Sequence, residues 1–147
     1  VAAMKPKILL VEDETSLAEI IGDNLLEEGY EVTIAEDGRK GMNLWQSQKP
    51  DLVLLDIMLP YLDGYELCKR MRDTGDTTPV LFLSAKGRPD ERVMGLQVGG
   101  DDYLPKPFHL PEFLLRVQNM LRRKSWSEKP LDATVMIDGN TVDFRAW

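Results

Sequence analysis

Short apolar runs alternate with longer amphipathic stretches along the chain. The runs Ile8–Val11, Asp51–Leu55 and Pro79–Leu83 show little polar alternation, which is typical of strands buried on both faces of a parallel sheet. Two further β-type runs, Glu31–Ala35 and Asp102–Leu104, complete the predicted strands. Between them, apolar residues recur at helical spacing over residues 15–28, 38–48, 65–72, 90–98 and 111–123. This alternation predicts a doubly wound α/β fold, with parallel strands joined by right-handed crossovers.

The last part of the chain has a different character. Residues 125–133 are polar and contain Pro130, so we expect a linker there, after a first domain that spans residues 5–124. Beyond it, Thr134–Ile137 and Thr141–Phe144 are β-type runs on either side of an Asp-Gly-Asn turn signal. Because an isolated hairpin is only marginally stable in water, residues 134–147 are interpreted as the start of a truncated second domain.

The composition narrows the class of protein. The net charge is −7 over 147 residues, and an acidic domain does not attract nucleic acid, because neutralising phosphates requires clustered Lys and Arg. A single cysteine, Cys68, rules out an internal disulfide framework and a multi-cysteine metal site. The apolar runs are too short to cross a bilayer and no signal-peptide pattern opens the chain, so we expect a cytoplasmic protein without membrane contact.

Polar residues collect where the predicted strands end. In doubly wound sheets, ligands bind beyond the carboxyl ends of the strands. The first strand is followed there by Glu12 and Asp13, and the third by Asp56. The fourth strand is followed by Ser84 and the fifth by Lys106. We therefore expect these five side chains, far apart in sequence, to meet at one edge of the sheet.

The chemistry of this set points to phosphoryl transfer. Three carboxylates brought together raise one another's pKa or require a cation. With oxygen ligands alone, and no thiolate or imidazole nearby, the set favours a hard ion such as Mg²⁺. Lys106 and the Ser84 hydroxyl can contact an incoming phosphoryl group. Asp56 is the central candidate for the nucleophile, whose attack on phosphorus gives an acyl phosphate.

Four stretches carry a family resemblance: VEDE at 11–14, LLDIMLPYLDGYE at 54–66, LFLSA at 81–85 and GGDDYLPKPF at 99–108. Over residues 5–124 the chain resembles the CheY-like receiver domain of two-component response regulators. The resemblance implies a five-stranded parallel sheet in the order 2-1-3-4-5 with five helices. It also implies a signalling domain rather than a metabolic enzyme, one that catalyses only its own phosphorylation and dephosphorylation.

The resemblance further implies a cofactor and its ligands. Mg²⁺ would be held by Asp13, Asp56 and the backbone carbonyl of Met58, with Glu12 acting through water. Pro60 and Gly64 would belong to a rigid loop after the phosphoacceptor.

For the phosphoryl group, the resemblance implies that Asp56 accepts it from a partner sensor histidine kinase. Ser84 and Lys106 would contact its oxygens, and Tyr103 and Ser84 would act as the conformational switch. The family usually has a cis peptide at the position of Lys106–Pro107. A partly exposed structural tyrosine is the rival interpretation of Tyr103.

A second set of charges resembles that of the OmpR/PhoB subfamily, whose phosphorylated members dimerise symmetrically across their fourth helix, fifth strand and fifth helix. Mapped onto this chain, the cross-subunit ion pairs join Arg92 with Glu112, Asp102 with Arg116, and Asp101 with Arg123. Ordinary surface charges are the alternative, because exposed ion pairs contribute little to stability.

The tail fits the same subfamily. The segment VMIDGNTVDFRAW at 135–147 resembles the opening of the winged-helix DNA-binding domain of these regulators. The resemblance then implies a transcription factor that contacts DNA only through a part that lies beyond Trp147. A stand-alone receiver that controls a protein partner, with no DNA binding, remains the alternative.

Two other classes of protein share parts of the pattern. A Mg²⁺-dependent phosphohydrolase with an aspartyl-phosphate intermediate usually has a second acid two residues after the nucleophile, where this chain has Met58. A flavodoxin-like cofactor binder needs a first loop rich in Ser, Thr and Gly to cradle phosphate, whereas the loop here is VEDETS. Turnover of a generic phosphomonoester would favour the phosphohydrolase.

Overall fold

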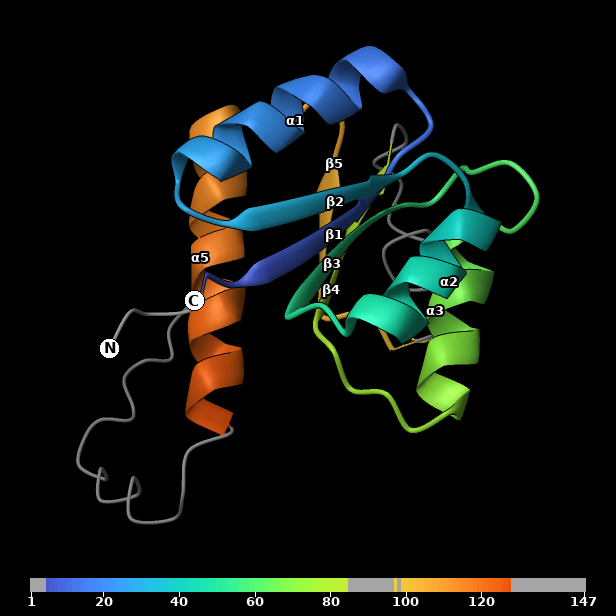
Figure 1. The fold of residues 1–147 in the computed structure, drawn as a ribbon. Helices are drawn as coiled ribbons and strands as arrows, with labels where there is room; N and C mark the ends of the chain where they lie inside the picture. Colours follow the sequence, from blue (N-terminus) through green and yellow to red (C-terminus); the bar gives the residue numbers. More distant parts are fainter. Residues whose placement is uncertain (1–4, 85–96, 98, 128–147) are drawn as a thin grey trace.

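The computed structural model describes residues 5–84, 97 and 99–127. Its centre is a five-stranded parallel sheet in the order β2-β1-β3-β4-β5, with the helices on both sides (Figure 1). The strands are β1 (Lys7–Val11), β2 (Glu31–Ala35), β3 (Leu52–Asp56), β4 (Val80–Ser84) and β5 (Asp102–Pro105). The helices are α1 (Thr15–Glu27), α2 (Gly38–Gln48), α3 (Gly64–Asp73) and α5 (Leu110–Ser127). The predicted fold class and strand order are confirmed.

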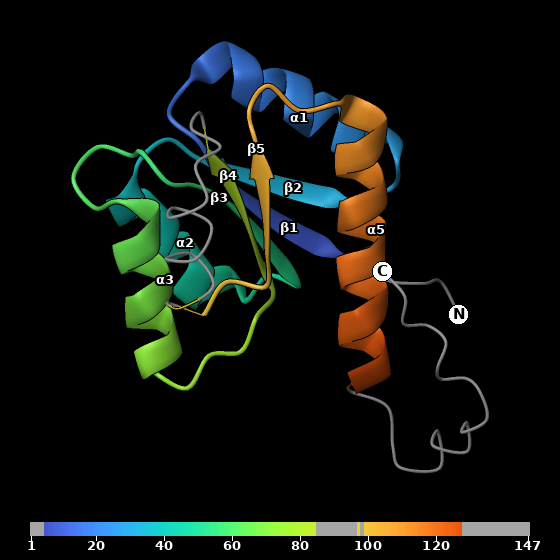
Figure 2. The same ribbon diagram turned by 180° about the vertical axis from the view of Figure 1, so that it is seen from behind.

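Each face of the sheet has its own apolar core. Helices α1 and α5 cover one face, and α2 and α3 cover the other (Figures 1 and 2). On the first face, Ile21 of α1 and Phe113 of α5 pack with the alternate strand residues Leu10 and Leu54. On the second face, Trp45 packs with the strand residues that lie between those of the first face and point to the other side of the sheet. Because both faces are covered, the central strands are apolar at nearly every position, which is why they read as continuous apolar runs.

The register of the strands brings their carboxyl ends level. Val11 lies opposite Leu55 in the β1–β3 pair, and Asp56 lies opposite Leu83 in the β3–β4 pair. Ser84 in turn lies opposite Pro105. The residues at and just after these positions are therefore neighbours along one edge of the sheet.

Local signals start and end the helices. The side chain of Asp37 caps α2 by accepting from the Lys40 N–H at 2.8 Å, and Asp63 caps α3 by accepting from the Glu66 N–H at 2.8 Å. Both bonds satisfy a backbone donor that the first helical turn leaves unpaired. At the end of α2, Lys49 adopts a left-handed conformation with φ of 49°, a position that usually favours glycine.

The last helix is longer than the sequence pattern predicted. We expected it to run from Pro111 to Arg123, but α5 extends from Leu110 to Ser127. No proline or glycine interrupts residues 124–127, so these residues, part of which we expected in a linker, continue the helix. The predicted helix at 90–98, apart from residue 97, and the predicted hairpin at 134–147 lie outside the described residues. Within the described part, no helix is long and apolar enough to span a membrane.

Candidate functional site

Three carboxylates meet at the carboxyl edge of the sheet, as predicted. Glu12 and Asp13 follow β1, and Asp56 ends β3. One carboxylate oxygen from each lies within 4.8 Å of the others. Glu12 and Asp56 are 1% and 4% exposed, whereas Asp13 is exposed. The cluster therefore has a buried inner part and one acid at its mouth.

Lys106 brings a positive charge to these acids. Its Nζ donates to Oε1 of Glu12 at 2.8 Å and lies 3.6 Å from Oδ2 of Asp56. The lysine follows β5, and its backbone N–H donates to the carbonyl oxygen of Ser84, which joins the ends of β4 and β5. The Lys106–Pro107 peptide is cis, as the family resemblance implied. The Lys106 ammonium thus contacts two of the three carboxylates, an arrangement that leaves excess negative charge at the site.

Burial and this charge imbalance together shift the pKa values of Asp56 and Lys106. Burial, reinforced by the charge of Glu12, raises the pKa of Asp56 from 3.8 to about 7, although Lys106 partly opposes the shift. Burial alone would lower the pKa of Lys106, but its hydrogen bond to Glu12 and the charge of Asp56 outweigh burial and leave that pKa raised. A further cation in contact with Asp56 would therefore stabilise the ionised form of its carboxylate.

The loop after Asp56 is fixed by a close backbone approach. The Gly64 N–H donates to the Ile57 carbonyl at 2.8 Å. A Cβ at residue 64 would collide with the Asp56 carbonyl oxygen and would lie 3.0 Å from the Ile57 Cα. The Met58 N–H approaches Oδ1 of Asp56 at 3.4 Å, and the Met58 side chain is exposed. Glycine is thus required for the loop to fold back beside the central carboxylate.

Ser84 and Tyr103 lie next to this edge and are buried. Ser84 ends β4 and is 1% exposed. Tyr103, in β5, is 4% exposed, and its ring packs into the core on the α2 and α3 side of the sheet. Its inward position agrees with a structural role and with one state of a switch, so a switching movement stays a prediction.

Four residues of the predicted dimer face, Asp101, Asp102, Glu112 and Arg116, form ion pairs within one chain. Arg116 of α5 contacts Asp102 of β5 at 2.7 Å and Glu112 at 3.0 Å. Asp101 contacts Arg72 of α3 at 3.2 Å. Arg123 lines a shallow hollow between β5 and α5 together with Asp102 and Arg116. Arg92 lies outside the described residues. The cross-subunit pairing of these charges stays a prediction.

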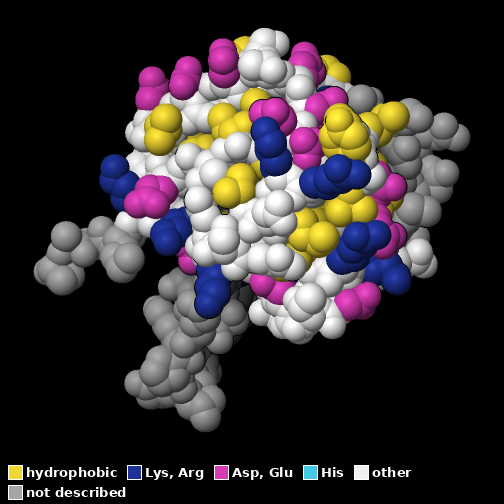
Figure 3. Space-filling model, turned by 45° about the vertical axis from the view of Figure 1, so that its right-hand side comes forward, with side chains coloured by type: hydrophobic (Ala, Val, Ile, Leu, Met, Phe, Trp, Pro, Cys, Tyr) yellow, Lys and Arg dark blue, Asp and Glu magenta, His cyan; other side chains and the backbone are white. Residues whose placement is uncertain are grey.

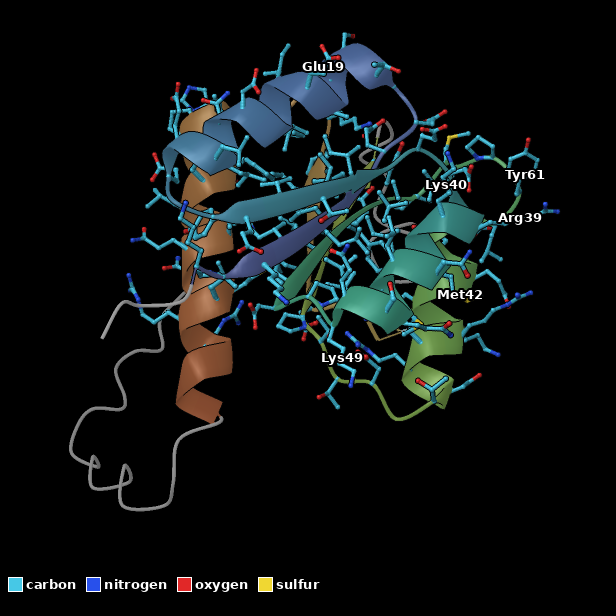
Figure 4. All side chains as sticks on the ribbon, in the orientation of Figure 1. Glu19, Arg39, Lys40, Met42, Lys49 and Tyr61 are labelled. Carbon is cyan, nitrogen blue, oxygen red and sulfur yellow. The ribbon has the colours of Figure 1, made fainter. Side chains whose placement is uncertain are left out.

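Two contacts had no sequence signal. Arg72 reaches from α3 to the segment before β5, and nothing in its spacing pointed there. Arg39 of α2 places its guanidinium 4.8 Å from the ring centroid of Tyr61, a residue with φ of 70° in the loop after Asp56. Figure 4 shows these two side chains together at the outer end of that loop. Cation–π contacts of this kind depend on how a helix and a distant loop meet and cannot be found from composition.

Charge is unevenly spread over the surface. Acidic side chains gather along the upper margin of the molecule, over α1, while basic and apolar side chains mix over α2 and α3 (Figure 3). Helix α1 contains acids at Glu19, Asp23 and Glu27 and no Lys or Arg. The acidic cluster thus opens between an acidic helix and a mixed surface.

The comparisons with known proteins agree with this site. The model of the response regulator receiver domain matches residues 8–118. The response regulator MprA of Mycolicibacterium vanbaalenii is 48% identical over 120 residues, which are 82% of this chain and 52% of that protein. MprA of Mycobacterium tuberculosis is 45% identical over 130 residues, or 88% of this chain and 55% of that protein. The chain spans about half the length of these curated relatives.

Solved structures give the same result. The receiver domain of the Francisella response regulator 1452 superposes with a TM-score of 0.78 at 37% identity, covering 81% of this chain and 98% of that one. The BeF3-activated N-terminal receiver domain of Klebsiella pneumoniae RstA superposes with a TM-score of 0.75 at 32% identity, covering 79% of this chain and 98% of that one.

Proposed function

The chain belongs to the response regulator receiver domain family, and on that premise we propose that Asp56 accepts a phosphoryl group from a sensor histidine kinase. One observation carries the proposal: three carboxylates converge on a buried centre that also holds Lys106. Phosphoryl transfer requires mainly positioning and neutralisation of charge, and this group of side chains supplies both.

The residues present fit a hard divalent cation. Glu12, Asp13 and Asp56 offer oxygen ligands within 4.8 Å of one another, and within the described residues no cysteine or histidine joins them. Oxygen donors of this kind suit Mg²⁺. Asp13, Asp56 and the carbonyl of Met58 would hold the ion directly, and Glu12 through water. Bound there, Mg²⁺ would offset the charge of the entering phosphoryl group.

The chemical step uses the carboxylate of Asp56 as the nucleophile. An oxygen of Asp56 attacks phosphorus in the partner's phosphohistidine, the phosphorus–nitrogen bond breaks, and the histidine leaves with the bonding electron pair. The product is an acyl phosphate on Asp56. Lys106 exchanges part of its contact with Glu12 for a phosphoryl oxygen, and the Ser84 hydroxyl donates to another. Hydrolysis of the acyl phosphate resets the domain.

Phosphorylation acts as a switch between two conformers. The phosphoryl group can shift the population only by interacting more favourably with one conformer than with the other, and the ends of β4 and β5 are where it makes that difference. Ser84 and Lys106 move toward the phosphoryl group, and the ring of Tyr103 follows. The dimer face of Arg92, Asp101, Asp102, Glu112, Arg116 and Arg123 then favours self-association.

The output follows from the subfamily. The charges on β5 and α5 and the tail at 135–147 support assignment to the OmpR/PhoB group, which would make the longer protein a cytoplasmic transcription regulator. DNA would be bound only by a part outside this sequence, because the domain itself is acidic. Dimerisation would place two such parts on paired half-sites.

The proposal is tested by intact mass after incubation with acetyl phosphate, with Mg²⁺ or with EDTA. We expect one phosphoryl adduct on the parent protein in Mg²⁺, little in EDTA, and none on Asp56→Asn. The matched control is Asp63→Asn, since asparagine also caps a helix and leaves α3 intact. An adduct retained by Asp56→Asn, or no Mg²⁺-dependent adduct on the parent, would contradict the proposed function.

A further inference from the structure

Arg72 ties three segments of the chain together from the C-terminal end of α3. Its Nε donates to the Gly99 carbonyl at 2.9 Å, and one terminal nitrogen donates to the Asp76 carbonyl at 3.2 Å. The other terminal nitrogen donates to Oδ2 of Asp101 at 3.2 Å. The side chain is only 20% exposed. A guanidinium presents several donors in a fixed plane, so a single side chain can hold all three acceptors in one arrangement.

The acceptors are themselves fixed. Oδ2 of Asp101 also accepts from the backbone N–H of Val80, the first residue of β4, at 2.8 Å. The Asp101 N–H donates to the Val80 carbonyl at 2.9 Å. Gly99 has φ of +100°, and a Cβ there would lie 2.8 Å from Cγ of Arg72. The segment that enters β5 is thus held against both α3 and the start of β4.

The residues held by Arg72 adjoin the charged face of β5 and α5 along the chain. The residue after Asp101 is Asp102, the first of β5, whose two carboxylate oxygens accept from Arg116 at 2.9 and 2.7 Å. Arg116 in turn donates to Glu112. A shift of the segment before β5 would therefore displace Asp102 relative to α5.

We infer that Arg72, Asp76, Gly99 and Asp101 form a clamp, in which Arg72 is a positioning residue that sets Asp102 for its ion pair with Arg116. The clamp rests on the proposed function only in that the charged face of β5 and α5 is taken as the output surface of the switch. Arg72 lies on the α3 side of the sheet, so the clamp links that side to the opposite output face.

An ordinary surface ion pair does not account for these contacts. Exposed pairs contribute little because water screens them and two mobile side chains must be ordered. Arg72 is mostly buried, and two of its three acceptors are backbone carbonyls. On the same helix, Arg70 pairs with Glu66 at 3.1 Å with both side chains about half exposed. Arg70 therefore provides a matched control for a surface pair.

The clamp also changes the expected role of Asp101. The family resemblance maps Asp101 to a cross-subunit pair with Arg123, but its carboxylate is already engaged by Arg72 and Val80. Asp101, whose side chain is 45% exposed, supports the face through its bonds within the chain, and Asp102, Glu112 and Arg116 remain its contact residues. Loss of Arg72 should therefore alter this face without touching the acidic site.

The test compares the parent with Arg72→Gln, Arg72→Lys and Arg70→Gln. The readouts are the guanidinium Nη1–H resonance of Arg116, the group that donates to Asp102, amide hydrogen exchange at Val80 and Asp101, and the extent of phosphorylation by acetyl phosphate and Mg²⁺. With Arg72→Gln we expect a shifted Arg116 resonance and exchange about tenfold faster at both amides, because a charge-assisted bond is lost. Arg72→Lys, which keeps the charge but loses the planar fork, should give an intermediate result. Arg70→Gln should change neither the Arg116 resonance nor the exchange at the two amides.

The outcomes separate the clamp from the proposed function. If Arg72→Gln leaves the Arg116 resonance and both amides as in the parent, the clamp is wrong, whatever the protein does with acetyl phosphate. If Arg72→Gln speeds exchange throughout the sheet and not only at the entry to β4 and β5, Arg72 is merely structural and the inference is also overturned. Absence of a phosphoryl adduct on the parent would count against Asp56 as the phosphoacceptor and would leave the clamp intact.

Discussion

Removing the charge of Asp56 should stabilise the metal-free domain at alkaline pH. Folding places this carboxylate beside Glu12 in a buried site, and its pKa rises from 3.8 to about 7. Between these two values the folded protein holds a proton that the unfolded chain has lost. The contribution of Asp56 to the free energy of unfolding is therefore most favourable below pH 3.8 and is lost as the pH rises through the folded-state pKa of about 7. At pH ~8 the folded state carries the full cost of the ionised carboxylate.

The size of the effect follows from the same shift. The difference between 3.8 and about 7 sets an upper limit of roughly 4 kcal/mol on the cost at pH ~8. Asn at position 56 removes the charge but leaves Lys106 paired with Glu12 alone, and a buried amide still needs partners. We therefore expect Asp56→Asn to raise the free energy of unfolding by about 1–3 kcal/mol at pH ~8. At pH ~5.5, where Asp56 is mostly protonated, the gain should be under about 1 kcal/mol.

The assay is urea denaturation followed by circular dichroism in EDTA at both pH values. Glu19→Gln is the control, because it removes one exposed acid from α1 that is not among the three clustered carboxylates (Figure 4). Adding Mg²⁺ should stabilise the parent by about 1.4 kcal/mol at ten times its dissociation constant and the Asn variant by less. If Asp56→Asn is no more stable than the parent at pH ~8, the buried carboxylate is not the source of charge repulsion inferred from the structure.

Three further changes test particular contacts. Gly64→Ala forces a Cβ into the Asp56 carbonyl and should lower the unfolding free energy by at least about 2 kcal/mol; a near-neutral urea midpoint would show that the loop can move aside. Lys49→Gly relieves the left-handed end of α2 and should stabilise by about 0.5–1 kcal/mol in the same assay, whereas a loss would mean that the lysine side chain contributes packing. Burial raises the pKa of the Cys68 thiol to about 11, so a thiol reagent followed by absorbance at pH ~8 should label it only at the rate of unfolding; rapid labelling in the folded state would contradict its burial.

The sequence predicted the sheet and the site because both follow from local patterns. Strands covered on two faces must be apolar at nearly every position, so their ends are marked by the first polar residue. The carboxyl ends of parallel strands share an edge, and the sequence pattern therefore predicted that Glu12, Asp56 and Lys106 lie together. The ranges of β2 and α2 were also predicted to the residue.

Other features depend on contacts between distant segments and left no pattern. The bond from Lys106 to Glu12 joins residues 94 positions apart, and it was predicted only as proximity, not as a pair. Arg72 looked like any basic residue near a helix end, a common place for cations. Lys49 has a left-handed backbone although nothing about lysine favours it. The end of α5 was placed too early because the apolar stripe fades before the helix does.

The most direct test of the phosphoacceptor is chemical identification of the modified residue. After incubation with acetyl phosphate and Mg²⁺, borohydride reduction converts an aspartyl phosphate to homoserine, which peptide mass spectrometry then places in the sequence. We expect homoserine at position 56 in the parent protein, and none without Mg²⁺. Reduction at Asp13 in place of Asp56, or no reduced residue at all, would contradict the assignment of Asp56 as the residue that accepts the phosphoryl group.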